Sequence, residues 1–135
     1  MDDNKLIELS KEILDLRGKT LDKRINDFLK NNTKIYCKGL NKRPVFIDEY
    51  LFFIDSRNSP DKNHRKKAFF SCIELIKKVG KDNITNLKNN SGKISYEFKG
   101  ITPNGNLVGV HIVDFSIKKD KKLKLVSTFW DSKKA

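Results

Sequence analysis

The spacing of the hydrophobic residues changes once along the chain, and this change constrains the fold more than any other feature. Before Gly80, apolar residues recur every three to four positions, as they do on one face of a helix. After Gly80 they alternate with polar residues, most clearly in Ile94–Lys99 and Leu107–Phe115. Helices followed by an antiparallel meander predict an α+β domain whose helices pack on one sheet face. The other face of the sheet is then open to a ligand.

Three helices are expected before Gly80. The first covers residues 5–16, and the second begins after a capping Thr20 and stops at Asn31. The third is the clearest, because Ser59 is a good N-cap and Pro60 suits the first helical position. Its buried stripe consists of Phe69, Cys72, Ile73, Ile76 and Val79.

Two further segments complete the expected elements. Lys34–Cys37 is typical of a short strand, and residues 122–130 are expected to form the last strand. Val45–Ile54 is apolar at eight of its ten positions and must be buried. Its periodicity does not distinguish a helix from a strand.

Positive charge is distributed unevenly. Residues 1–29 carry a net charge of −1, whereas residues 30–135 carry +13. We therefore expect one domain, 1–135, with a helical scaffold segment at 1–32 and a basic catalytic body at 33–135. A surplus of this size favours a polyanionic partner, and nucleic acid is the usual one. No apolar run approaches the roughly 18 residues that a membrane span needs, so no membrane association is expected.

The cysteines and histidines do not predict a metal site. Cys37 and Cys72 are separated by 35 positions and lack CxxC partners, so two free thiols are expected, with a disulfide as the alternative. Neither cysteine has a metal-like spacing to His64 or His111. We expect no metal and no cofactor.

The alternation of the meander places two titratable residues on the open face. If the helices cover Val108, Val110 and Ile112, then His111 points the other way, and Glu97 does the same on the neighbouring strand. A carboxylate and an imidazole on adjacent strands can serve as general base and acid. The alternative is that both are ordinary polar residues on a solvated sheet face.

A second cluster is the run from His64 to Lys67 near the start of the third helix. Cationic residues at that end oppose the helix dipole, and an anionic ligand would compensate for this. The alternative is a solvated helical turn.

These residues predict a metal-independent endoribonuclease, which needs a base, an acid and cations around the phosphate. His64 and His111 are the expected acid and base, with Glu97 as a second candidate for the base. The expected nucleic-acid contacts are phosphate contacts from Arg57, Arg65, Lys66, Lys67 and Lys99, and base stacking on Tyr96 or Trp130. Two alternatives remain open: a noncatalytic binder of RNA or DNA, and an interaction or immunity-type protein with an acidic partner.

The order of helices, His-containing helix and meander, with the ending Ser127-Thr128-Phe129-Trp130, resembles the barnase, EndoU, colicin and RelE group of ribonuclease toxin domains. The resemblance covers about residues 45–135. It departs from the EndoU-type pattern at Trp130, where a tyrosine is expected, and at His111, which comes late and lies within a strand.

The resemblance implies cleavage of RNA, above all tRNA, by a bacterial toxin of a contact-dependent inhibition or other polymorphic system. It also implies that Thr128 positions the phosphate or the substrate. The toxin would act in the bacterial cytoplasm after delivery from another cell, as a monomer, and an acidic immunity protein would neutralise it.

Overall fold

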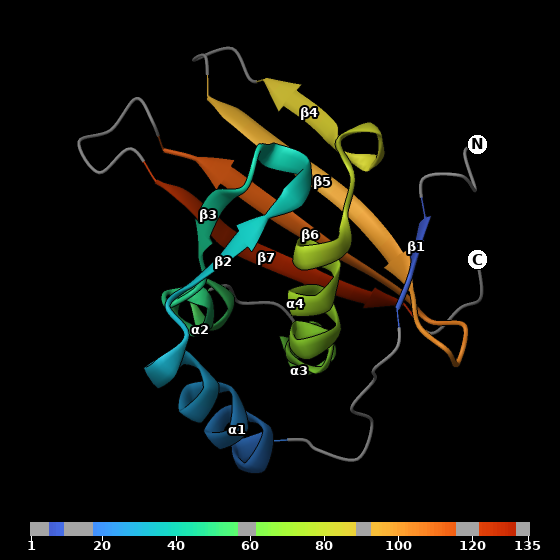
Figure 1. The fold of residues 1–135 in the computed structure, drawn as a ribbon. Helices are drawn as coiled ribbons and strands as arrows, with labels where there is room; N and C mark the ends of the chain where they lie inside the picture. Colours follow the sequence, from blue (N-terminus) through green and yellow to red (C-terminus); the bar gives the residue numbers. More distant parts are fainter. Residues whose placement is uncertain (1–5, 10–17, 57–61, 89–92, 116–121, 132–135) are drawn as a thin grey trace.

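The computed structural model describes residues 6–9, 18–56, 62–88, 93–115 and 122–131 (Figure 1). Within these residues the chain has an α+β fold, with helices packed on a curled mixed sheet. The strands are β1 (Leu6–Glu8), β2 (Lys34–Cys37), β3 (Arg43–Phe46), β4 (Thr85–Lys88), β5 (Ile94–Ile101), β6 (Leu107–Asp114) and β7 (Leu123–Asp131). The helices are α1 (Gly18–Asn31), α2 (Tyr50–Asp55), α3 (Lys62–Lys67) and α4 (Phe69–Lys78), with 3₁₀ turns at Lys38–Leu40 and Lys81–Asn83.

The described strands form a sheet in the order β1-β5-β6-β7-β3-β2, with β4 also paired to β5. The antiparallel meander expected after Gly80 is confirmed in β5, β6 and β7, and β4 adds a strand to it. The sheet is nevertheless mixed, because β1 runs parallel to β5 and β3 runs parallel to β7. The meander is therefore extended on both sides by strands from the first third of the chain.

The first of these strands corrects an expectation. Leu6–Glu8 is strand β1 and not the start of a helix, so the N-terminal segment is not purely a helical scaffold. It pairs with Lys99–Ile101, the part of the β5 edge beyond β4, and the N–H of Leu9 donates to the carbonyl of Ile101 at 2.9 Å. Pairing of this kind overrides a weak helical pattern. The rest of the expected helix, residues 10–17, lies outside the described residues.

The apolar segment Val45–Ile54 contains both kinds of element. Val45 is fully buried in β3, which lies between β2 and β7. The chain then turns into the short helix α2, where Tyr50 and Ile54 are buried. Val45 in the inner strand and the α2 residues that pack toward β7 account for the buried positions. Phe52 is 68% exposed, so the expectation that the whole segment is buried is wrong at that position.

The third expected helix is divided into α3 and α4 at Ala68. The carbonyl oxygen of Arg65 accepts hydrogen bonds from the Thr128 hydroxyl at 2.6 Å and the Tyr50 hydroxyl at 2.9 Å. In an uninterrupted helix this oxygen would accept from the N–H of Phe69. Side chains from β7 and α2 therefore take the place of a helical bond at the break. The predicted stripe on α4 is buried as expected, whereas Ser59 and Pro60 lie outside the described residues.

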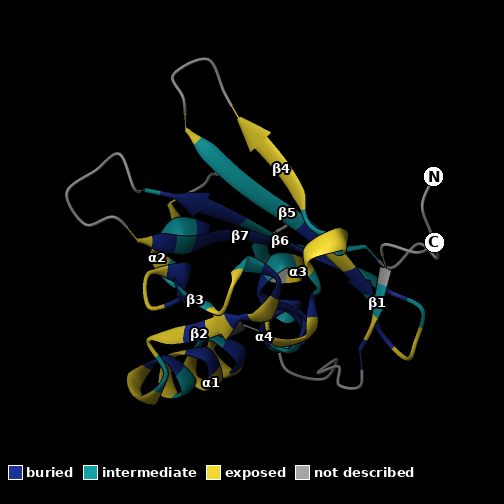
Figure 2. Cartoon of the chain, turned by 45° about the horizontal axis from the view of Figure 1, so that its top comes forward, coloured by how far each residue is buried: buried dark blue, intermediate teal, exposed yellow. Residues whose placement is uncertain are grey.

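Helix α4 packs against β2 and β6 and provides the largest helical contribution to the core (Figure 1). Strands β6 and β7 are largely buried, whereas β4 is exposed along its length (Figure 2). None of the helices in the described ranges is long and apolar enough to cross a membrane.

Lys66 links three helices. Its ammonium lies 2.7 Å from Asp55 Oδ1 of α2 and 3.0 Å from Asp22 Oδ1 of α1, and its side chain is only 7% exposed. Burial by itself lowers the pKa of Lys66, but hydrogen bonds and charge from Asp55 and Asp22 outweigh this and raise it. The residue expected to contact phosphate is thus occupied in holding α1 and α2 to α3, which corrects that expectation.

Replacing Lys66 with methionine is expected to lower the free energy of unfolding by about 1–3 kcal/mol. This loss is smaller than the loss expected for a fully buried ion pair, because the side chains of Asp22 and Asp55 both reach solvent. The pKa of Lys66 is higher in the folded state than in the unfolded state. The stability that charged Lys66 contributes is therefore fully present below about pH 10.4 and is lost as the pH rises further. Urea unfolding at about pH 7, 9 and 11 measures this.

Lys23 provides the matched control for this substitution. It forms an i,i+4 ion pair with Asp27 at 3.1 Å, but its side chain is 78% exposed. Lys23→Met is therefore expected to cost less than about 0.5 kcal/mol. Equal losses in the two variants would show that burial adds nothing to the Lys66 pairs.

Candidate functional site

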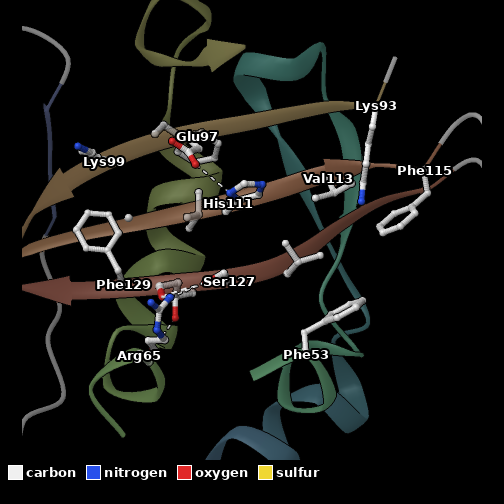
Figure 3. Close-up of a pocket in the computed structure, with 15 residues that line it drawn as sticks. Phe53, Arg65, Lys93, Glu97, Lys99, His111, Val113, Phe115, Ser127 and Phe129 are labelled. Carbon is white, nitrogen blue, oxygen red and sulfur yellow. Dashed lines mark hydrogen bonds and ion pairs between the residues drawn. The ribbon is translucent and has the colours of Figure 1, made fainter. Parts of the chain in front are cut away.

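The open face of the sheet is hollowed over its central strands. The hollow is a cavity of about 770 Å³ over the central parts of β5, β6 and β7, and α2 and α3 reach its rim (Figure 3). The side chains labelled around it are Phe53, Arg65, Lys93, Glu97, Lys99, His111, Val113, Phe115, Ser127 and Phe129.

Glu97 and His111 meet at the centre of this cavity. They are directly opposite each other in the β5–β6 register, and Glu97 Oε2 lies 2.9 Å from His111 Nδ1. Their side chains are 44% and 35% exposed, so both remain within reach of a ligand. Because Nδ1 is held by the carboxylate, Nε2 is the nitrogen of His111 left to act in the cavity. The placement of this pair on the open face agrees with the alternation in the sequence.

A β-bulge decides which side chains of β7 join the pair. The register shifts between His111 and Ile112, so that Ser127 pairs with His111 while Leu125 pairs with Ile112. Val126 is the extra residue. As a result, Ser127 and Phe129 face the cavity.

The same bulge turns Thr128 and Trp130 toward the helices. Thr128 is 2% exposed, and its hydroxyl is bonded to the Arg65 carbonyl and lies 2.7 Å from the Tyr50 hydroxyl. Burial raises the pKa of Tyr50 far above its usual value, so this phenol stays protonated as part of the network. The Thr128 hydroxyl therefore holds α3 to β7, while its carbonyl accepts from Arg65 at the cavity wall. That Thr128 positions the substrate stays a prediction.

Arg65 enters the cavity from α3, past the edge of β7. Its Nη1 donates to Ser127 Oγ at 2.7 Å and to the Thr128 carbonyl at 2.9 Å (Figure 3). The backbone carbonyl of Arg65 is anchored at the same time by Tyr50 and Thr128. Hydrogen bonds therefore hold both the backbone and the guanidinium of Arg65 in place. The guanidinium brings a fixed positive charge to the row formed by Glu97, His111 and Ser127.

The run from His64 to Lys67 does not act as one cluster. Successive residues of a helix point about 100° apart, so only Arg65 reaches the cavity. His64 stacks on Trp130 with centroids 5.6 Å apart and planes at 16°, and Lys67 lies 5.5 Å from the same ring. Trp130 projects from the helix-covered side of β7, so the structure does not bring His64 together with His111.

The remaining expected nucleic-acid contacts divide in the same way. Lys99 lines the cavity, with its ammonium 5.8 Å from the centre of the Phe129 ring. Tyr96 faces away from Glu97 and lines a separate hollow beside Asn41 and Arg43. Arg57 lies outside the described residues.

Several cavity residues are not among those expected from the sequence, and Ser127, Phe129, Lys93, Phe115 and Phe53 matter most for the site. Alternation in β7 does not decide which of its residues face the open side, and the bulge turns Ser127 and Phe129 toward the cavity. Lys93 precedes β5 and Phe53 lies within the short helix α2, so strand alternation does not reach either of them. Phe115 follows His111 by four positions, and the alternation of Leu107–Phe115 places it on the same face.

No cluster of three or more potential metal-ligating side chains occurs among the described residues. Cys37 and Cys72 are both buried and unpaired, as the spacing predicted. Burial raises the pKa of each thiol, which keeps both in the unreactive protonated form.

Comparisons of this chain with protein-family models, with curated proteins and with solved structures give no match.

Proposed function

We propose that this protein is an endoribonuclease that cleaves RNA by attack of the RNA's own 2′-hydroxyl, without a metal ion. The observation that carries the proposal is the Glu97–His111 pair, 2.9 Å apart in an open cavity that also holds the Arg65 guanidinium. A carboxylate, an imidazole and a fixed cation are the groups that this reaction requires. The net charge of +12 favours an RNA substrate.

Glu97 takes the proton of the 2′-hydroxyl as its oxygen forms a bond to phosphorus. The bond from phosphorus to the 5′-oxygen breaks, and His111 gives the proton on Nε2 to that leaving oxygen. The products are a 2′,3′-cyclic phosphate and a 5′-hydroxyl. Arg65, with Lys99 at the rim, offsets the negative charge that builds on the phosphoryl oxygens.

Two further points belong to the proposal. Glu97 takes the role of base, and His64, stacked on Trp130 on the other side of the sheet, lies outside the site. We also propose that the helix-on-sheet arrangement is of the barnase, EndoU, colicin and RelE type.

The test is digestion of total tRNA in excess EDTA. The parent protein is expected to release discrete fragments ending in cyclic phosphate, and Glu97→Gln is expected to slow their release about 10²- to 10⁴-fold. The glutamine keeps the shape of the side chain, and retention of the circular-dichroism spectrum confirms the fold. Intact RNA of retarded mobility with the parent protein would instead identify a noncatalytic binder.

A further inference from the structure

Two phenylalanines lie at opposite ends of the cavity, on either side of the proposed catalytic row. Phe129 lies beside Lys99 at one end, and Phe115 lies with Phe53 and Lys93 at the other (Figure 3). Phe129 is paired with Gly109, and Phe115 comes six residues after that glycine, which corresponds to about 20 Å along a strand. The two rings therefore mark the ends of an extended surface and not the walls of one small pocket.

The Phe129 ring lies flat on the sheet. A Cβ atom added to Gly109 would come within 1.9 Å of Phe129 Cε1, and within 2.6 Å and 2.8 Å of two further ring atoms. The ring thus occupies the space above Gly109 that a larger side chain would fill. One face of the ring is turned toward the cavity, and Figure 3 shows the ring nearly face-on from the open side.

Each of these rings is accompanied by lysine ammonium groups. Lys99 Nζ lies 5.8 Å from the centre of Phe129, while Lys93 and Lys124 lie 5.5 Å and 5.2 Å from the centre of Phe115. The backbone N–H of Phe115 donates to the carbonyl of Lys122 at 2.8 Å, which holds the ring position at the end of β6. An aromatic face beside a cation suits a nucleotide, since the base stacks on the ring and the phosphate contacts the cation.

We propose that this open face binds a run of unpaired RNA nucleotides, with one base stacked on Phe129 and another on Phe115. The proposal rests on the ribonuclease function above and names its substrate class. In a duplex the faces of the bases are already stacked on their neighbours, so only unpaired bases can use these rings. The scissile phosphate lies between the rings, beside Glu97, His111 and Arg65.

Binding of an uncleavable RNA tests the proposal without requiring catalysis. The probe is a fluorescent 2′-O-methyl oligonucleotide, which lacks the attacking hydroxyl, used as a single strand or annealed to its complement. Fluorescence anisotropy is expected to show tighter binding of the single strand. Phe115→Ala and Phe129→Ala are each expected to weaken single-strand binding about 5- to 150-fold and to leave duplex binding unchanged.

Phe52 supplies the matched control, because it is 68% exposed on α2 and does not line the cavity. Phe52→Ala is expected to bind both probes as the parent does. Phe129→Leu keeps an apolar cover over Gly109 and is expected to weaken single-strand binding too, even where the alanine variant fails to fold.

Equal affinity for single strand and duplex would overturn the proposal, as would unchanged binding in both alanine variants. Either result would leave the ribonuclease function standing if the parent still cleaves tRNA. Absence of cleavage by the parent, with the expected binding pattern, would overturn the ribonuclease function alone.

Discussion

Replacing His111 with alanine is expected to slow RNA cleavage about 10²- to 10⁴-fold, because His111 is the group proposed to give the leaving 5′-oxygen its proton. The side chain is 35% exposed, and its ion-pair partner among the described residues is Glu97, so the fold should survive the change. The initial rate of fragment release from tRNA, with the unfolding midpoint as a check on stability, measures the effect.

His64→Ala is the informative comparison for this prediction. His64 stacks on Trp130 on the opposite side of β7 from His111, so the variant is expected to keep the parent rate within a few-fold. Equal losses in the two variants would mean that the histidines act together, which the arrangement in the structure does not provide for.

Removing the guanidinium of Arg65 is the second change expected to have a large effect. Arg65→Ala takes away the positive charge nearest to the proposed phosphate position, and the rate is expected to fall about 10²- to 10³-fold. Arg65→Lys keeps the charge, but its shorter side chain ends in a compact ammonium and lacks the planar guanidinium whose Nη1 donates to both Ser127 Oγ and the Thr128 carbonyl. The cleavage rate of Arg65→Lys is expected to lie between the rates of the parent and of Arg65→Ala.

Arg24 on α1 is exposed and does not line the cavity, so Arg24→Ala controls for the loss of one positive charge. Single-turnover rates at saturating RNA separate an effect on the chemical step from an effect on binding. If Arg65→Ala cleaves as fast as Arg24→Ala at saturation, Arg65 serves only to attract RNA.

Much of the candidate site could be predicted from local pattern. Alternation in β5 and β6 placed Glu97 and His111 on the same open face, and the structure pairs them there. Side chains two positions apart on a strand share a face whatever the rest of the fold does. The buried stripe of α4 followed from helical spacing, which is likewise a local property of the sequence.

Local pattern could not predict where the α3 side chains lie relative to elements far away in the sequence. In the sequence, the run from His64 to Lys67 resembles one anion-binding unit. In the structure α3 lies at the edge of β7, so the side chains of this run point to different sides of that strand. Arg65 enters the cavity, Lys66 is buried between Asp22 and Asp55, and His64 stacks on Trp130. Which side of a short helix meets a strand depends on packing across more than 60 residues of sequence.

The sequence by itself determined the α+β class, the basic character of the chain and the shared face of Glu97 and His111, because composition and side-chain period are local properties. Only the tertiary structure decided that Ser127 and Phe129 face the cavity while the Thr128 hydroxyl points toward the helices. The physical reason is the single extra residue at Val126: a bulge reverses the alternation of β7, and its position depends on how β6 and β7 pair.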